Sequence, residues 1–427
     1  MKRGFYTIMA AQFFSSLADN ALFVTAVELI RTSGGAEWQR AALVPMFALF
    51  YVILAPFVGA FADSRPKGEV MFISNAIKVL GCLMMLFGTH PLLSYAIVGL
   101  GAAAYSPAKY GILTELLPAS QLVKANGWIE GLTIASIILG VLVGGQLVGA
   151  HVSEYLLSFD FPIFETGIDT APEVAILLLI TFYALAAWFN TRIPKTDVVM
   201  RAMPKNLLAL LPDFWDCNTR LWKDRLGQIS LATTTLFWGV SGNVRYIVLA
   251  WSAAALGYST TQASSLVGVV AIGTAVGAVV ASVRMKLHQA TRVMPLGIGM
   301  GVLVIGMNFI DNVWVAAPFL ILLGALGGFL VVPMNALLQH RGHNLMGAGR
   351  SIAVQNFNEQ TCILLLGGFY SFSTGMGLSA FGAITAFGFV VASIMWVIKR
   401  WHEHNLREHS AVLNHLIDVA KNDHLHG

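Results

Sequence analysis

Charged residues are scarce in this chain of 427 residues. Lysine, arginine, aspartate and glutamate together make up 11% of the sequence, whereas hydrophobic residues make up 56%. An ordinary soluble domain carries about 25% charged residues, so this composition excludes an ordinary globular protein. The mean hydropathy of +0.71 instead predicts a chain that lies largely within a membrane.

Cysteine is also rare. Cys82, Cys217 and Cys362 lie far apart in the sequence and show no paired spacing, so neither a disulfide framework nor a zinc site is predicted. Two His-x-His pairs near the C-terminus are better explained by a solvated tail than by metal binding. We therefore expect neither a metal nor a cofactor.

The sequence motifs of several enzyme classes are missing. There is no G-x-x-x-x-G-K-[ST] loop, which argues against nucleotide hydrolysis. There is also no Gly-x-Ser-x-Gly elbow and no His-x-x-x-x-Asp arrangement, so a membrane acyltransferase is disfavoured. The chain is predicted not to be an enzyme.

Long apolar runs dominate what is present. A membrane-spanning helix needs about 20 mostly apolar residues, and twelve stretches meet this length. They predict an all-α membrane protein with twelve transmembrane helices in two groups of six. The stretches are Phe5–Ile30, Ala41–Ala62, Val70–Thr89, Leu92–Leu116, Leu122–Val148, Val174–Ile193, Ile229–Leu256, Ala263–Val283, Val293–Ile310, Val313–Leu338, Gly349–Ser373 and Leu378–Ile398.

The placement of lysine and arginine predicts the orientation. With the N-terminus inside, only Arg31 and Arg40 fall in outer segments, so both termini are expected to be cytoplasmic. The predicted parts are an N-terminal six-helix half at 1–193, a cytoplasmic linker at 194–225, a C-terminal six-helix half at 226–400 and a cytoplasmic tail at 401–427. The tail is expected to form an interfacial helix whose apolar side is Val412, Leu413, Leu416 and Ile417.

Three charges inside predicted spans are the main candidates for a binding site: Asp19, Lys109 and Arg245. An intramembrane charge costs roughly 2.5–3.5 kcal/mol on insertion scales, so it normally pairs or faces a watery cavity and marks a substrate path. Lys78 also lies in a span, where a snorkelling or helix-contact lysine explains it as well as a site role does.

The two halves repeat weakly. A shift of 226 residues lays GLGAAAYSPAK on ALGGFLVVPMN and places Lys109 on Asn335. The same shift places Asp19 opposite Arg245, and a nearby offset aligns Glu130 with Glu359. Matching polar positions inside the spans indicate a binding site at the interface of two repeated halves.

The twelve spans, the basic central loop and the turn GAFADSRPKGEV resemble the major facilitator superfamily. Gly59, Asp63, Arg65 and Lys67 match the signature of that turn, although Ser64 and Pro66 depart from it. Within the superfamily, the chain is similar to the bacterial lysophospholipid transporter family over nearly its whole length. The stretches that carry this similarity include AQFFSSLADNALF, YSPAKYGIL, LFWG and VVPMNALLQ.

The resemblance implies a flippase that moves lysophospholipids, such as lysophosphatidylethanolamine, from the outer to the inner leaflet of the bacterial inner membrane. A cytosolic-side acyltransferase–acyl carrier protein synthetase would then re-acylate them. We expect the transporter itself to be a monomer that contacts membrane lipids and no nucleic acid.

The chemistry of such a substrate suggests roles for the intramembrane charges. Lys109 and Arg245 can bind the phosphate, and Asp19 with Asn20 can bind an ammonium group. Alternatively, Asp19 and Arg245 form a buried ion pair that only locks the halves together. The predicted substrate site is Asp19, Asn20, Tyr105, Lys109, Arg245 and Asn335, and the predicted gate is Asp63, Arg65, Lys67, Glu130, Asn356 and Glu359.

A second function stays open at this point. A facilitator-type exporter or ion-coupled symporter for another amphiphile or organic anion would need the same three intramembrane charges. Asp19 could relay a proton in such a carrier, whereas an uncoupled flippase drawn onward by consumption of its product fits equally well.

Overall fold

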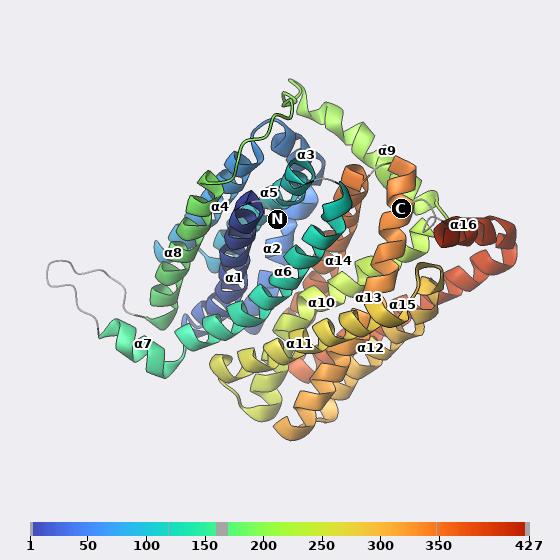
Figure 1. The fold of residues 1–427 in the computed structure, drawn as a ribbon. Helices are drawn as coiled ribbons and strands as arrows, with labels where there is room; N and C mark the ends of the chain where they lie inside the picture. Colours follow the sequence, from blue (N-terminus) through green and yellow to red (C-terminus); the bar gives the residue numbers. More distant parts are fainter. Residues whose placement is uncertain (1–2, 118, 159–169, 347, 423–427) are drawn as a thin grey trace. The chain divides into compact units, whose positions relative to one another are not determined.

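The computed structural model describes residues 3–117, 119–158, 170–346 and 348–422. Beside these gaps, the side chains of 3, 114, 119–124, 126, 127, 130, 343, 348 and 349 are not described. Over this part of the chain the structure consists of helices and connections without strands, which confirms the predicted all-α class (Figure 1). The chain forms two compact units, one of residues 1–207 with 257–268 and the other of residues 208–256 with 269–427.

The first unit contains eight helices within its described residues. Two sharp bends of 62° interrupt it, one between α2 and α3 and one between α6 and α7. The helices are α1 (Arg3–Thr32), α2 (Glu37–Ile53), α3 (Ala55–Asp63), α4 (Lys67–Leu86), α5 (Pro91–Leu116), α6 (Ala119–Leu147), α7 (Ala150–Leu157) and α8 (Ala171–Thr191).

The second unit begins at Leu208, within the predicted linker. Part of this linker is helical, because α9 carries a buried face of Phe214, Cys217 and Leu221. The elements are η1 (Leu207–Ala209), α9 (Leu210–Lys223), α10 (Gly227–Leu256), α11 (Thr260–Arg284), η2 (Leu287–Val293), α12 (Pro295–Gly306), η3 (Met307–Phe309), α13 (Val313–Met346), α14 (Ala348–Gly375), α15 (Ala380–Glu408) and α16 (Ser410–Asn422).

Fewer helices qualify as membrane spans than the twelve expected. Among the described residues, seven helices are long and apolar enough to cross a membrane, or nine if each bent pair counts as one span. Helices α5, α10 and α14 cover three of the expected spans but are outside this set. They carry Lys109, Arg245 and Glu359, and such charged side chains lower the hydropathy of a helix.

Glycines let neighbouring helices approach closely. A Cβ at Gly140 or Gly144 of α6 would lie 2.6 Å from the carbonyl oxygen of Leu17 or Ala21 on α1. Small residues at such contacts are typical of closely packed transmembrane helices. As a result, the backbone of α6 lies directly on the part of α1 that holds Asp19.

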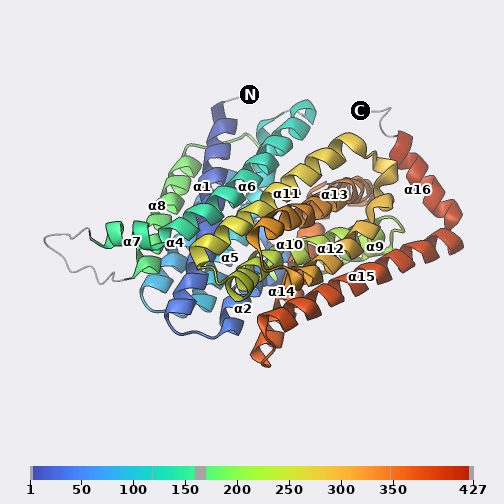
Figure 2. The ribbon, with the colours of Figure 1, turned by 90° about the horizontal axis from the view of Figure 1, so that it is seen from below.

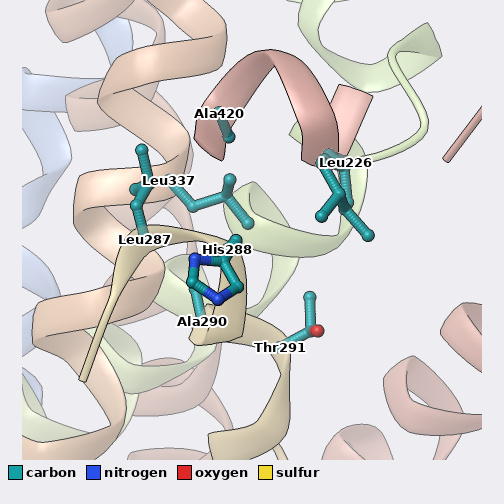
Figure 3. Close-up of a pocket in the computed structure, with 8 residues that line it drawn as sticks. Leu226, Leu287, His288, Ala290, Thr291, Leu337 and Ala420 are labelled. Carbon is teal, nitrogen blue, oxygen red and sulfur yellow. The ribbon is translucent and has the colours of Figure 1, made fainter. Parts of the chain in front are cut away.

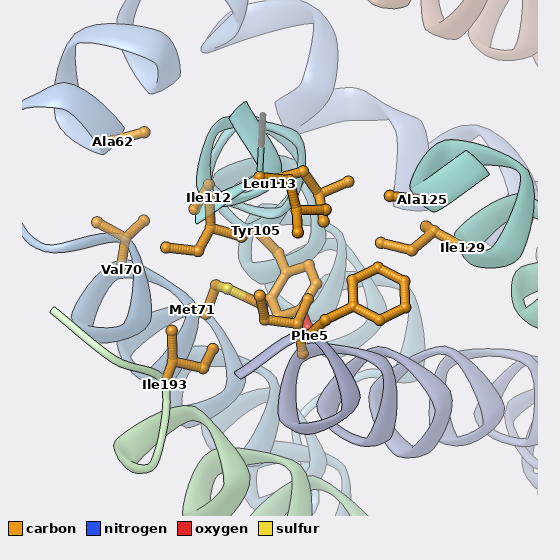
Figure 4. Packing of buried hydrophobic residues seen from close by; sticks show 13 residues of the cluster. Phe5, Ala62, Val70, Met71, Tyr105, Ile112, Leu113, Ala125, Ile129 and Ile193 are labelled. Atoms are coloured by element: carbon orange, nitrogen blue, oxygen red, sulfur yellow. The ribbon is translucent and has the colours of Figure 1, made fainter. Parts of the chain in front are cut away.

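A cluster of buried hydrophobic residues packs helices of the first unit together. Phe5 of α1, Met71 of α4 and Tyr105 of α5 are almost fully buried in it, together with Ile112 and Ile129 (Figure 4). At about 25 cal/mol per Å² of buried apolar surface, such side chains stabilise the bundle and hold these helices in fixed register.

The tail contains a helix, α16, whose apolar side packs largely against the protein itself. Figure 2 shows α16 turning away from the end of α15. Leu413 is fully buried, and Ile417 and Ala420 line a small pocket with Leu287 of η2 (Figure 3). Much of the face expected to meet the membrane therefore covers the protein's own hydrophobic surface, whereas Val412 is half-exposed.

Candidate functional site

Asp19 forms a buried ion pair with Lys78 inside the first unit. The Lys78 ammonium donates to Asp19 Oδ2 at 2.8 Å, and the Tyr183 hydroxyl donates to Asp19 Oδ1 at 2.6 Å. The lysine side chain is 2% exposed and the aspartate side chain 19% exposed. Three helices, α1, α4 and α8, thus meet at one carboxylate, and the carboxylate is the more accessible member of the pair.

The surroundings of Lys78 show that it does not snorkel. Its ammonium lies 5.2 Å from the ring centre of Tyr105 and 5.6 Å from that of Tyr183, within the range of cation–π attraction. It also donates to Ser15 Oγ at 2.9 Å. The snorkelling interpretation was wrong because this lysine points into the helix bundle and meets α1, α5 and α8.

Polar contacts continue from Ser15 through the unit. The Ser15 hydroxyl donates to Asn75 Oδ1 at 2.7 Å, and Asn75 Nδ2 donates to Asn190 Oδ1 at 2.6 Å. All three side chains are at most 1% exposed. Sequence reasoning missed this row of hydrogen bonds because its three residues are neutral and lie far apart in the sequence.

Two further predicted substrate residues of the first unit, Asn20 and Lys109, lie on α1 and α5. Asn20 is buried against Gly140 of α6, and its Nδ2 donates to the Ser16 carbonyl at 2.8 Å. Lys109 is half-buried one turn beyond Tyr105 on α5, with its ammonium 4.5 Å from the ring centre of Tyr110. Tyr105 is therefore the predicted residue that the structure brings to the Asp19–Lys78 pair.

A second ionic cluster joins the α3–α4 turn to the end of α5. Lys67 is buried, and its ammonium lies 3.2 Å from Asp63 Oδ1 and 3.4 Å from Glu115 Oε1. It also donates to the Ala62 carbonyl at 2.8 Å. Two of the predicted gate residues are thus in contact, whereas Arg65 pairs with Glu69 on the exposed surface at 2.7 Å.

Two residues of the predicted linker form hydrogen bonds with this second ionic cluster. Thr196 Oγ1 donates to Glu115 Oε2 at 2.7 Å, and the Arg201 amide donates to the Asp63 carbonyl at 3.0 Å. A pocket of about 280 Å³ lies beneath it, lined by Lys67, Glu115, Asn190 and Thr196 among others. The side chain of Glu130, another predicted gate residue, lies outside the described residues.

At the far end of α1, Glu28 is held from two sides. Its carboxylate accepts hydrogen bonds from Arg31 and from Thr260, and the glutamate is 7% exposed. Thr260 begins α11, whose first residues belong to the first unit. Sequence reasoning used Arg31 only as a topological marker and missed this group.

In the second unit, predicted substrate and gate residues share one partner. Gln355 Nε2 donates to Asn335 Oδ1 and, at 2.9 Å, to Glu359 Oε1. Asn356 is half-buried next to it in α14. Arg245 is half-buried on α10, where its Nε lies 3.4 Å from the Gly242 carbonyl oxygen. Gln355 thus connects Asn335, a predicted substrate residue, with Glu359, a predicted gate residue.

A buried ion pair that the sequence did not suggest ties α13 to the start of α10. Arg341 donates to both carboxylate oxygens of Asp224, at 2.6 and 3.1 Å, and both side chains are less than a tenth exposed. The Gly227 amide also donates to this carboxylate at 2.7 Å. The internal repeat offered a signal, because a shift of 226 residues places Glu115 on Arg341.

The three cysteines are free. On α9, burial and the nearby Asp213 raise the pKa of the Cys217 thiol. A thiol with a raised pKa is a poor nucleophile at neutral pH. The Cys217 thiol is therefore not activated for nucleophilic attack.

Comparisons with known proteins agree with this architecture. The family model described as Major Facilitator Superfamily matches residues 8–360. A lysophospholipid transporter LplT of Yersinia enterocolitica is 40% identical over 379 residues, covering 88% of this chain and 89% of the relative. The LplT of Escherichia coli O1:K1 is 38% identical over 404 residues, covering 94% and 97%.

Solved structures show the same fold at much lower identity. The nucleoside transporter NupG matches with a TM-score of 0.68 at 12% identity, covering 94% of this chain and 99% of that one. A bacterial homologue of the human lysosomal transporter Spinster, in an inward-facing and unoccupied conformation, matches with a TM-score of 0.61 at 15% identity, covering 98% and 96%. With its all-helical units and these matches, the chain belongs to the major facilitator superfamily and, within it, to the family of the lysophospholipid transporters LplT.

Proposed function

We propose that this protein carries lysophospholipids across the bacterial inner membrane by alternating access, from the outer to the inner leaflet. The proposal rests on one structural observation joined to the family: a buried Asp19–Lys78 pair in a chain about 40% identical to lysophospholipid transporters. A lipid-facing bundle has little other reason to keep two charges at its centre.

The pair suits a head group that carries both charges. In a lysophosphatidylethanolamine, the ammonium group can replace Lys78 at the Asp19 carboxylate, and the phosphate can accept from the lysine that is released. Tyr105 and Tyr183 frame the lysine and offer ring faces that attract cations. Because Asp19 is the more exposed member, the substrate reaches the carboxylate first.

Further residues complete the proposed path. Lys109 and Arg245 supply additional cations for the phosphate, and Asn20 and Asn335 supply amides. In this scheme the acyl chain protrudes between helices into the bilayer, because a single chain remains solvated by lipid there. The Asp63–Lys67–Glu115 cluster, tied to the linker, serves as the gate at the cytoplasmic end.

The topology belongs to the same proposal. Twelve spans with both termini in the cytoplasm would place the lysine-rich and arginine-rich loops inside, as the positive-inside rule requires. The product would then appear in the inner leaflet, where a cytosolic-side acyltransferase–acyl carrier protein synthetase re-acylates it. The transporter acts as a monomer and needs no cofactor for this step.

The test is uptake into proteoliposomes that contain the purified full-length protein. Radiolabelled lysophosphatidylethanolamine is added outside, and protected label is measured for the native chain and for Asp19→Asn, Lys78→Met, Lys109→Met and Arg245→Met. The exposed Lys205→Met serves as a control for loss of one positive charge.

We expect Asp19→Asn and Lys78→Met to reduce uptake at least tenfold in folded protein, and the control to transport normally. Uptake of another amphiphile but of no lysolipid would replace the substrate class while keeping a transporter. Normal lysolipid uptake by both variants would remove the ion pair from the mechanism. Chemical change of the lysolipid by the protein alone would contradict its assignment as a transporter.

A further inference from the structure

A row of hydrogen bonds that begins at Lys78 connects three helices of the first unit, α1, α4 and α8. It links Ser15 on α1, Asn75 on α4 and Asn190 on α8, through contacts of 2.9, 2.7 and 2.6 Å. None of these side chains is more than 1% exposed. Most buried polar groups in proteins have a hydrogen-bond partner, and Asn190 Nδ2 at the end of this row has none among the described residues, so three buried polar side chains in one row need a specific explanation.

The donors of the chain all point the same way. A serine hydroxyl has one hydrogen, and Ser15 gives it to Asn75, which leaves the serine oxygen to accept from Lys78. Asn75 in turn donates a hydrogen bond from Nδ2 to Asn190 Oδ1. Hydrogen bonds in such a row polarise one another, so the serine oxygen becomes a stronger acceptor for the ammonium group.

This arrangement matters when the ion pair opens. The other groups that face Lys78 are the Asp19 carboxylate, the rings of Tyr105 and Tyr183, and the Cys82 thiol on its own helix. If a substrate ammonium occupies the carboxylate, the serine oxygen is the polar partner from the protein that continues to hold the lysine.

We infer that Ser15, Asn75 and Asn190 are positioning residues that keep Lys78 fixed as a phosphate donor while the substrate occupies Asp19. This inference rests on the proposed function of the Asp19–Lys78 pair. The amide side chains orient and polarise without transferring protons, so the chain acts through geometry. Its far end, Asn190, lines the pocket beside Lys67 and Glu115, which connects the ion pair to the loop end of the unit.

The experiment measures KM and maximal rate of lysophosphatidylethanolamine uptake in proteoliposomes for Ser15→Ala, Ser15→Thr and Asn75→Leu. The matched control is Ser74→Ala, since Ser74 is equally buried on α4 but bonds only to the Val70 carbonyl of its own helix among the described contacts. Thermal unfolding of each purified variant establishes that it is folded.

Ser15→Ala is expected to raise KM roughly tenfold, because a hydrogen bond to a charged group is lost. Asn75→Leu is expected to raise KM severalfold, while Ser15→Thr keeps the hydroxyl and restores a nearly native KM. The maximal rate changes less than KM in each case. Ser74→Ala leaves both values as in the native chain.

A second measurement tests the positioning role separately from the proposed substrate site at the Asp19–Lys78 pair. Binding of a fluorescent lysolipid is titrated for Lys78→Met with and without Asn75→Leu, and the asparagine change should add nothing once the lysine is absent. Native KM in folded Ser15→Ala and Asn75→Leu, with Lys78→Met still defective, would overturn the positioning role alone. A normal Lys78→Met would overturn the proposed site itself.

Discussion

The contact between α11 and α13 should be unusually sensitive to a single methyl group. Gly273 and Gly277 of α11 face Gly324 and Gly328 of α13, four residues apart on each helix. A Cβ at Gly277 would lie 2.1 Å from the Ala325 carbonyl oxygen. Carbon and oxygen atoms in contact across helices normally stay about 3.3 Å apart, so the helices must separate by about 1 Å.

The energetic cost follows from this geometry. Overpacking a well-packed site costs roughly 1–3 kcal/mol, and the upper end applies here because the obstructing atoms belong to the backbone. Alanine regains about 1 kcal/mol of helix propensity over glycine. Gly277→Ala should therefore destabilise the second unit by about 2 kcal/mol and lower its Tm by about 4–8 °C.

The assay is thermal unfolding of the purified protein in one detergent, with Gly368→Ala as the matched control. A Cβ at Gly368 meets nothing within 4 Å, so that variant should unfold at the native temperature or slightly above it. Equal midpoints for Gly277→Ala and Gly368→Ala would refute the close approach of these two helices.

Three further predictions concern charges. Asp19→Asn and Lys78→Met should each destabilise the protein by about 3 kcal/mol, the lower end of the cost of breaking a buried ion pair, because the remaining charge loses its ionic partner but keeps a neutral one. The double variant should lose less than the sum of the two in thermal unfolding. Arg341→Met should cost about 3–5 kcal/mol for the same reason, whereas the exposed Arg220→Met should change stability by less than about 1 kcal/mol in the same assay. Lys67→Gln should lower the maximal rate of lysolipid uptake at least threefold with little change in KM; a changed KM alone would contradict a gate role.

The helices could be predicted from the sequence because a long run of apolar residues favours a membrane-spanning helix by itself, without information from the rest of the chain. The expected spans coincide with helices or bent helix pairs, and the intramembrane charges identified two of the helices that meet at the site. The pairing of those charges was not predictable in the same way. Asp19 and Lys78 lie 59 residues apart, and their contact depends on how α1 and α4 are rotated about their axes.

The same reason explains the other missed contacts. From the sequence, Arg341 and Asp224 each resemble an exposed charge in or beside a loop, because the sequence does not show that both side chains are buried. The tail helix was predictable from its apolar spacing, yet the sequence did not show that Leu413 would pack on the protein. Local pattern predicts which residues are polar or apolar within a helix, and tertiary packing decides which of them meet.

The buried ionic groups share one feature that bears on transport. Asp19 is held by Lys78 and a tyrosine hydroxyl, Lys78 also by a serine, Asp224 also by a backbone amide, and Lys67 also by a backbone carbonyl. Each of these four charges thus keeps a neutral hydrogen-bond partner when its ionic partner leaves. A buried pair without such a partner would leave a bare charge on opening, at a cost of several kcal/mol. Ion pairs that can open cheaply are what a carrier needs if its substrate replaces one member, so the neutral partners belong to the transport mechanism as much as the charges do.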